Sequence, residues 1–194
     1  MTDDTRFPLL VALACHDLRT PLATVHGFAR TLARQELEGP ASRYVEMIEA
    51  ASQQLAELLD ELALVARIEA GRFEPRPAQV DSLELARSAA AELEHGAARV
   101  SGEGATVWIE EEAARRAVRQ LARATRRHGG LESVAVVVQG PEVAISPVAG
   151  SAPGVITGEE LRELGAAASV AFLRAADASV ELDGDRLLIS LPTP

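Results

Sequence analysis

His16 is the residue whose type and position most directly suggest chemistry. An unperturbed imidazole is largely neutral near pH 7, and a neutral ring nitrogen can attack phosphorus. With Val11 and Leu18 at one core position of a helical repeat, His16 falls on the opposite side, so its ring should reach solvent. Such a nucleophile would be accessible to the active site of another protein. A lone exposed histidine is more often ordinary surface polarity, so spacing alone assigns it no role.

Pro21 follows Asp17 by four residues within the same helical stretch. Its ring would clash with the Asp17 carbonyl and remove one backbone hydrogen bond. We therefore expect the helix to bend just after His16. A proline inside so regular an apolar repeat suggests a functional requirement.

Two stretches of the N-terminal part carry apolar residues seven apart in two interleaved series. The first, over residues 5–35, has Phe7, Ala14, Pro21 and Phe28 with Val11, Leu18, Val25 and Leu32; the second has Tyr44, Ala51, Leu58 and Val65 with Ile48, Leu55 and Leu62. A break at Glu38, Gly39 and Pro40 separates them. This pattern predicts two long helices joined by a short turn, an antiparallel helical hairpin.

Additional apolar positions make both stripes wider than a contact between two helices requires. They are Leu10, Cys15, Leu22 and Ala29 in the first helix and Val45, Leu59 and Ala66 in the second, where Ser52 interrupts the series. This width suits a four-helix bundle, and one hairpin supplies only two helices. We therefore predict a twofold-symmetric homodimer in which two hairpins form one bundle.

The C-terminal part mixes helical and strand patterns. Gly71 fits a helix C-cap and residues 73–77 an extended connection, so we place the domain boundary between residues 75 and 76, giving domains 1–75 and 76–194. We expect helices at 82–93, 111–126 and 158–176 and strands at 105–109, 133–138, 142–146, 179–182 and 186–191. The second domain is then an α/β sandwich with helices on one sheet, and the fold class of the chain is α+β.

The sequence CHDLRTPL at residues 15–22 resembles the phosphoacceptor box of sensor histidine kinases, which reads His-Asp/Glu-Leu-Arg-Thr-Pro-Leu. The likeness continues to residues 66–73, ARIEAGRF, which are similar to that family's exit from its dimerisation hairpin. This resemblance implies that His16 is the phosphoacceptor and that Asp17 helps to orient or activate it. It further implies that Thr20 positions water for dephosphorylation, and it places Arg19 among the catalytic residues.

By order and length, residues 80–192 resemble the ATP-binding domain of the same family, but three elements of its nucleotide site are missing. The metal-coordinating asparagine would fall near Ala124, and the chain has no asparagine to supply the oxygen ligand that Mg²⁺ requires. The adenine-binding Asp-x-Gly-x-Gly loop corresponds to residues 146–155, which contain no aspartate. The lid and glycine-rich box are reduced to LGAAA at 164–168. We expect a degenerate site, with no cofactor and no metal bound by this chain.

Several charged residues remain outside the motif. Six arginines cluster on or near one expected helix: Arg115, Arg116, Arg119, Arg123, Arg126 and Arg127. They could bind phosphate or an acidic partner, but a solvated helix face is the favoured interpretation. The other histidines, His26, His95 and His128, are interpreted as structural or solvated.

The composition excludes several classes of function. A formal net charge of -10 disfavours binding to nucleic acid and to anionic membranes. One cysteine excludes an internal disulfide, and no apolar run of about 18 residues could span a bilayer. The N-terminal residues also lack the pattern of a signal peptide. From these features we expect a cytoplasmic protein.

These observations favour a histidine phosphotransferase of a two-component phosphorelay. His16 would take a phosphoryl group from the aspartate of one response-regulator receiver domain and pass it to another, with Mg²⁺ supplied by the regulators. Two alternatives remain. One is a divergent, sensor-less histidine kinase that phosphorylates itself with ATP, and the other is a non-catalytic scaffold or inhibitor that binds response regulators or kinases.

Overall fold

The computed structural model describes residues 3–34 and 40–194, and between residues 3 and 14 it describes the side chains of Pro8 and Val11 alone. The predicted turn residues Glu38 and Gly39, and the side chains of Phe7, Leu10 and Ala14, lie outside the described residues. The contacts divide the chain into two compact units, Met1–Arg72 and Phe73–Pro194. No helix in the described ranges is both long enough and apolar enough to cross a membrane.

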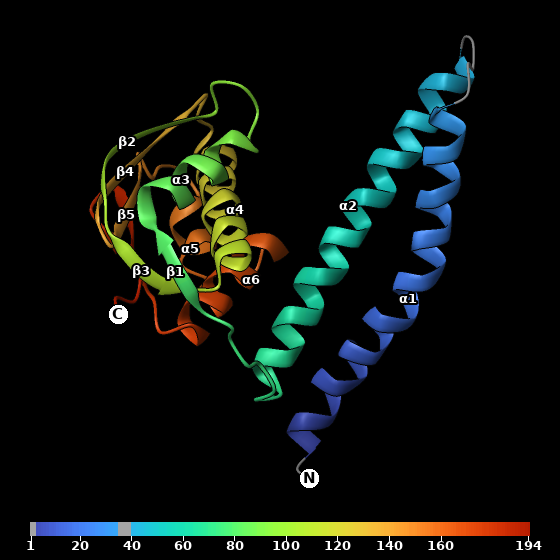
Figure 1. Cartoon of the computed structure of the whole chain (residues 1–194), viewed down its shortest axis with the longest axis horizontal. Helices are drawn as coiled ribbons and strands as arrows, with labels where there is room; N and C mark the ends of the chain where they lie inside the picture. Colours follow the sequence, from blue (N-terminus) through green and yellow to red (C-terminus); the bar gives the residue numbers. More distant parts are fainter. Residues whose placement is uncertain (1–2, 35–39) are drawn as a thin grey trace. The chain divides into compact units, whose positions relative to one another are not determined.

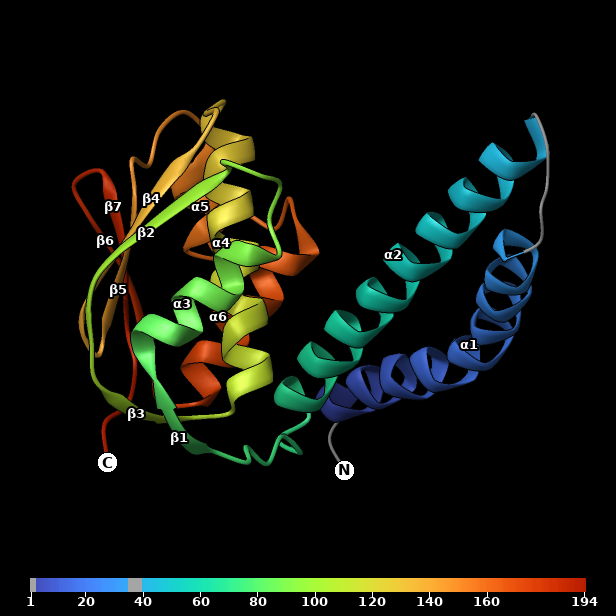
Figure 2. The same cartoon turned by 45° about the horizontal axis from the view of Figure 1, so that its top comes forward.

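The first unit is a helical hairpin of α1 (Asp3–Ala33) and α2 (Pro40–Glu69), which lie side by side and run antiparallel (Figure 1). Figure 2 shows that α1 bends along its length, and Pro21 lies in its interior. A proline there lacks the N–H that would otherwise bond to the Asp17 carbonyl. The predicted hairpin is confirmed.

The apolar residues of the hairpin are divided between two faces. Cys15 and Ala29 of α1 and Val45 and Ala66 of α2, which all belong to the additional positions that widen the stripes, are buried. Most described residues of the heptad series are instead exposed in the single chain: Leu18, Val25, Phe28 and Leu32 on α1, and Tyr44, Ile48, Leu55, Leu58 and Leu62 on α2. Small residues at the additional positions therefore bring the two helices together. The larger side chains of the heptad series face outward, and we call them the outward apolar seam.

Gly71 ends α2 in the way that the sequence predicts. Its φ is 63°, a left-handed conformation in which glycine has no Cβ to clash. The Gly71 N–H donates to the Ile68 carbonyl at 2.9 Å, and the Arg72 N–H donates to the Arg67 carbonyl at 2.9 Å. These two bonds form a Schellman motif.

The second unit is a layered α/β domain. Its strands are β1 (Ala78–Asp81), β2 (Ala98–Gly104), β3 (Thr106–Ile109), β4 (Val134–Gly140), β5 (Glu142–Ser146), β6 (Ser179–Asp183) and β7 (Arg186–Ser190). Its helices are α3 (Ser82–Ala91), α4 (Glu111–Gly129), α5 (Ala152–Ile156) and α6 (Leu164–Ala175). Helices α3, α4 and α6 cover one face of the main sheet (Figure 1). This arrangement confirms the predicted α+β fold class.

The main sheet has the strand order β2-β4-β5-β7-β6. β2 and β4 are parallel and the other neighbours are antiparallel, while β1 and β3 form a separate antiparallel pair. Alternate residues of the central strands are fully or almost fully buried, among them Val136, Val138, Val143, Ile145, Leu187 and Ile189. Leu121 of α4 and Phe172 of α6 are buried as well, so the core lies between the sheet and these helices.

The structure contains two strands that the sequence analysis missed. β2 has the sequence ARVSGEG and lies at the edge of the sheet, where it needs no apolar alternation. Gly102 has a φ of 110°, and a Cβ there would lie 2.0 Å from the Val138 carbonyl oxygen. β1 is four residues long with one buried residue, Val80, which is too little for a periodic signal.

The helix expected over residues 158–176 is shorter than predicted. Gly158 has a φ of 79° and Glu163, the residue before α6, is extended. Both conformations are incompatible with an α-helix, so α6 begins at Leu164. A further short helix, α5, precedes this segment and was not expected.

Replacing Asp177 by glycine should stabilise the second unit. Asp177 follows α6 with a φ of 59°, and the adjacent Ala178 N–H closes a 2.9 Å bond to the Leu173 carbonyl. Glycine relieves the cost of this left-handed conformation, so we expect Asp177→Gly to raise the free energy of unfolding by about 0.5–1 kcal/mol. Urea denaturation followed through Trp108, the only tryptophan, would measure the change.

Asp177→Ala is the matched control, because it removes the same charge but keeps a Cβ. It should leave the stability unchanged or lower it. Equal stabilisation by alanine and glycine would mean that the carboxylate, and not the backbone, is the source of the effect.

Candidate phosphoacceptor site

His16 projects from α1 into solvent. Its side chain is 77% exposed, whereas the preceding Cys15 is buried in the hairpin. Leu18, two residues later, points about 200° around the helix from His16 and belongs to the outward apolar seam. The predicted exposure of the ring is confirmed, and the imidazole lies on neither apolar face of the helix.

The carboxylate of Asp17 contacts the imidazole of its neighbour. His16 Nδ1 lies 3.2 Å from Asp17 Oδ1. An ionised carboxylate can only accept hydrogen bonds, so this contact requires the proton of a neutral ring to be on Nδ1. The Nε2 lone pair of His16 is then free to attack an electrophile. Asp17 thus has the geometry to orient the nucleophile, as the sequence motif implies.

Arg19 and Thr20 are also exposed, but they have different neighbours. The Arg19 guanidinium donates from Nη2 to Asp60 Oδ1 on α2 at 2.6 Å. Thr20 lies one turn after His16, and its carbonyl accepts a 3.2 Å hydrogen bond from the Thr24 hydroxyl. The structure therefore places Asp17 against the His16 ring, Arg19 against the second helix, and Thr20 on the surface near His16.

Asp60 is the residue of this site that sequence reasoning missed. It lies 41 positions after Arg19, in a helix whose register against α1 the heptads do not determine. The side chains of Arg19 and Asp60 are 49% and 45% exposed, so water screens the pair. The sequence would reveal Asp60 as a partner of the motif only if the alignment of α2 against α1 were already known.

His26 has a structural partner within the hairpin. Its Nδ1 lies 3.0 Å from the Ser52 hydroxyl, which itself donates to the Glu49 carbonyl at 2.9 Å. Ser52 is the residue that interrupts the apolar series of α2, and it is buried. Since its hydroxyl proton is used in the bond to Glu49, Ser52 accepts from His26 Nδ1–H. The interpretation of His26 as structural agrees with this bridge between the helices.

In the second unit, the positions that resemble a nucleotide site belong to the core. Ala124 on α4 is completely buried, and Gln120, one turn earlier, is 6% exposed. A Cβ on Gly165 of α6 would lie 2.9 Å from the Gln120 side chain, which shows how closely these two helices approach. In the segment between β5 and α6, α5 buries Val155 and Ile156. Across the described residues, no three His, Cys, Asp or Glu side chains gather as a metal site requires.

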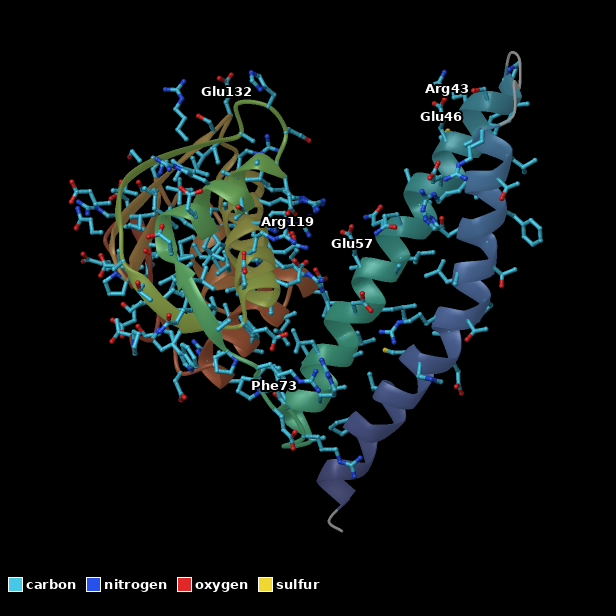
Figure 3. All side chains as sticks on the ribbon, in the orientation of Figure 1. Arg43, Glu46, Glu57, Phe73, Arg119 and Glu132 are labelled. Carbon is cyan, nitrogen blue, oxygen red and sulfur yellow. The ribbon has the colours of Figure 1, made fainter. Side chains whose placement is uncertain are left out.

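Most of the clustered arginines form ion pairs with carboxylates. Glu92, just after α3, pairs with Arg115 and with Arg119, the latter at 3.0 Å. Glu94 pairs with Arg126 at 2.8 Å. Figure 3 shows Arg119 projecting from α4 on the side away from the sheet. The basic helix is thus partly neutralised by acidic residues of its own domain.

Glu163 holds the C-terminal end of α4. His128 Nε2 lies 2.9 Å from Glu163 Oε2, with both side chains largely buried, and Arg127 lies 4.0 Å from the same oxygen. His128 is therefore structural in this fold. His95 is exposed.

Comparison with known proteins identifies a domain within the hairpin and the fold of the chain. Residues 9–71 match the family model of the His Kinase A (phospho-acceptor) domain. A comparison with curated protein sequences gives no significant match.

Solved structures similar to this chain include histidine kinases. ShkA, solved at full length with AMPPNP, has a TM-score of 0.68 and 23% identity over 95% of this chain and 46% of its own. This chain therefore spans about half the length of ShkA. The histidine kinase AdeS of Acinetobacter baumannii has a TM-score of 0.58 and 12% identity, covering 92% of this chain and 98% of its own. The cytoplasmic segment of histidine kinase QseC has a TM-score of 0.55 and 11% identity, covering 84% and 100%. At these identities the likeness shows the fold.

The tautomer of His16 should depend on Asp17. In the wild-type chain we expect the neutral ring to be enriched in the Nδ1–H form, because the carboxylate accepts that proton. Asp17→Ala removes the acceptor and should shift the ring toward the tautomer ratio of free imidazole. Two-bond ¹⁵N–¹H correlation spectra distinguish the two nitrogens, and exposed His95 serves as an internal reference. A His16 ratio equal to that of His95 in the wild-type chain would contradict the contact.

Proposed function

We propose that this histidine kinase-like chain, which has a His Kinase A domain over residues 9–71, is a histidine phosphotransferase of a two-component phosphorelay. His16 would receive a phosphoryl group from the phosphoaspartate of one receiver domain and donate it to the aspartate of another. A response-regulator partner would place the activity in the cytoplasm. The observation that carries the proposal is an exposed imidazole whose Nδ1 is engaged by Asp17 and whose Nε2 is free.

The proposed transfer is a displacement at phosphorus. Nε2 of neutral His16 attacks the phosphorus of the aspartyl phosphate, the N–P bond forms, and the P–O bond breaks with its electron pair leaving on the aspartate carboxylate. The Nδ1 proton stays on the ring, which becomes a phosphoimidazolium, and the Asp17 carboxylate stabilises this positive charge. The second transfer is the same step in reverse, with another receiver aspartate as the nucleophile.

This chemistry relies on positioning and on charge neutralisation. Mg²⁺ and basic groups of the receiver would neutralise the phosphoryl oxygens. Thr20 lies one turn from His16 on the exposed surface. From there its hydroxyl would orient the water that hydrolyses phospho-His16.

The residues of the second unit favour the proposed phosphorelay protein over an ATP-dependent histidine kinase. It has the fold of a kinase ATP-binding domain, and ShkA was solved with AMPPNP. In this chain, however, the helix that should carry the metal-binding asparagine has Ala124, buried and without an oxygen ligand. Residues 146–155 contain no adenine-binding aspartate. We propose that this unit acts as a docking domain for receivers.

The outward apolar seam supports the proposed homodimer. Leu18, Val25 and Phe28 of α1 and Leu55 and Leu58 of α2 are all at least 39% exposed in the single chain. A soluble protein rarely leaves so long an apolar stripe uncovered. A second hairpin would bury it in a four-helix bundle and leave the His16 ring, which lies outside the seam, accessible.

Transfer from a phosphorylated receiver tests the proposed function directly. Purified wild-type chain, mixed with a receiver domain labelled on its aspartate with ³²P, should gain acid-labile label within minutes. His16→Ala should gain none, because His16 is the described histidine whose ring is both exposed and in direct contact with a carboxylate. Phosphate-affinity gel electrophoresis measures the incorporation, and His95→Ala is the matched control that should behave as wild type.

The two alternatives predict different results in the same assay. Incorporation of label from [γ-³²P]ATP into His16 without an added kinase would identify a divergent histidine kinase and overturn the relay. Receiver binding without any transfer, in either direction and across a panel of receivers from the same source, would identify a scaffold.

Leu55→Glu should separate the dimer into monomers. Leu55 is 52% exposed in the seam, so a carboxylate there would be buried without a partner in the bundle. We expect the mass from light scattering after gel filtration to halve while the circular dichroism signal of the helices persists. Leu161→Glu, at an 82% exposed leucine of the second unit, should remain dimeric. A wild-type monomer would contradict the predicted bundle.

A further inference from the structure

We infer that Asp60 on α2 determines the stability of phosphorylated His16 by competing with the phosphoryl group for Arg19. The inference rests on the proposed function, because it concerns the phosphorylated form of His16. It gives Asp60, which lies outside the sequence motif, a positioning role. It also gives a reason why an arginine stands at position 19 of the motif.

The geometry places Arg19 between two possible anionic partners. Residues three apart on a helix are neighbours, so Arg19 lies next to His16 on the surface of α1. Long helical side chains also lean toward the N-terminus, which in this case is the turn that carries His16. In the unphosphorylated chain the guanidinium is instead bound by Asp60, with Nη2 2.6 Å from Oδ1.

The local charges make Arg19 the cation on which a phosphoryl group here would depend. Between residues 12 and 20 the sequence has one basic residue, Arg19, and one acidic residue, Asp17. Asp60 contributes a second carboxylate by its contact with Arg19. The phosphoryl group adds negative charge at this turn. It thus enters a region in which the neighbouring Arg19 guanidinium is already paired with Asp60.

An exchange of partners by Arg19 costs little. Guanidinium groups bind carboxylate and phosphate with the same planar array of donors. Both side chains of the Arg19–Asp60 pair are about half exposed, so water compensates when the pair opens. The more highly charged phosphoryl group then draws Arg19 toward His16, and Asp60 is left with water. Because Asp60 opposes this movement, the phosphorylated form gains less from Arg19 than it would if Asp60 were absent.

This competition fits a residue that must pass on the phosphoryl group it receives. A fully neutralised phospho-His16 would retain the group, whereas an unneutralised one would be difficult to form. Asp60 keeps the stability of the phosphorylated ring between these extremes. Its effect is exerted through Arg19, whose guanidinium it binds directly.

The test uses a phosphoryl donor that requires no receiver. Potassium phosphoramidate is used to phosphorylate the full chain, and ³¹P NMR follows the phosphohistidine signal, which is assigned to His16 by its absence in His16→Ala. The measured quantity is the pH midpoint at which the phosphorylated ring loses its Nδ1 proton. A guanidinium near the group disfavours the positively charged ring and lowers this midpoint.

The expected shifts have opposite signs for the two partners. Asp60→Asn releases Arg19, so the midpoint should fall by roughly half a pH unit. Arg19→Gln should raise it by a similar amount. Asp60→Glu keeps the carboxylate and should restore the wild-type value. In the Arg19→Gln background, Asp60→Asn should have less than half its effect, because most of its influence passes through the guanidinium.

Glu49→Gln is the matched control. It removes another ion pair between the same two helices, Arg30 to Glu49 at 3.6 Å, about four turns from His16. It should leave the midpoint unchanged, which separates the effect on charge from loosening of the hairpin. In parallel, the ¹⁵N signal of Arg19 Nε–H should move when the wild-type chain is phosphorylated.

Three results would overturn the inference: an unchanged midpoint in Asp60→Asn, an equal shift in Glu49→Gln, or an Arg19 signal that phosphorylation does not move. Failure of the proposed function is recognised separately. A His16 that accepts phosphoryl from phosphoramidate but never from a phosphorylated receiver would refute the relay and leave the competition for Arg19 intact. A His16 that phosphoramidate does not modify would contradict the accessible Nε2 on which both proposals depend.

Discussion

The advance of about 100° per residue along α1 is the constraint on which the function of this chain depends. It divides one helix into three faces with different environments. Cys15 and Ala29 are buried in the hairpin, Leu18 and Val25 form an outward apolar stripe, and His16 projects into water. A shift by one residue, to the position of Cys15, would bury the imidazole, and a shift by two, to the position of Leu18, would place it on the apolar stripe. The exposed nucleophile and the uncovered stripe are thus consequences of the same periodicity.

The features that the sequence predicts correctly are those that local geometry determines. The hairpin, the face of His16 and the Gly71 cap follow from residues within a few turns of one another, and the structure agrees with all three. The Arg19–Asp60 pair is different, because it depends on how α1 and α2 are aligned, which small buried side chains and the connecting turn determine. β2 was missed for a related reason: an edge strand with two glycines is specified by its pairing with β4 and not by its own pattern.

The fold of the second unit depends on the apolar side of α4, and the chain has no asparagine on this helix. α4 is required by the core, where Leu121 and Ala124 are fully buried between the sheet and α6. Its outward arginines are paired with Glu92 and Glu94 of the same unit. Packing therefore depends on the apolar side of α4, and an asparagine for metal binding is not needed to keep it in place. The fold identifies the relatives of this domain, but its chemistry has to be argued from individual side chains.

The turn of α1 that carries His16 lacks one backbone hydrogen bond of a regular helix. Pro21 has no N–H to donate to the Asp17 carbonyl, so one hydrogen bond of the ladder is missing at this turn. Side chains supply other constraints in the same place. The Thr24 hydroxyl caps the Thr20 carbonyl, and Arg19 connects the turn to Asp60 on α2. Because side-chain contacts at an exposed site respond to added charge more readily than a backbone ladder does, the proposed phosphorylation would change these contacts while the rest of the hairpin stays intact. The proline beside His16, the proposed phosphoacceptor, therefore makes the position of this turn depend more on a small set of charged side chains.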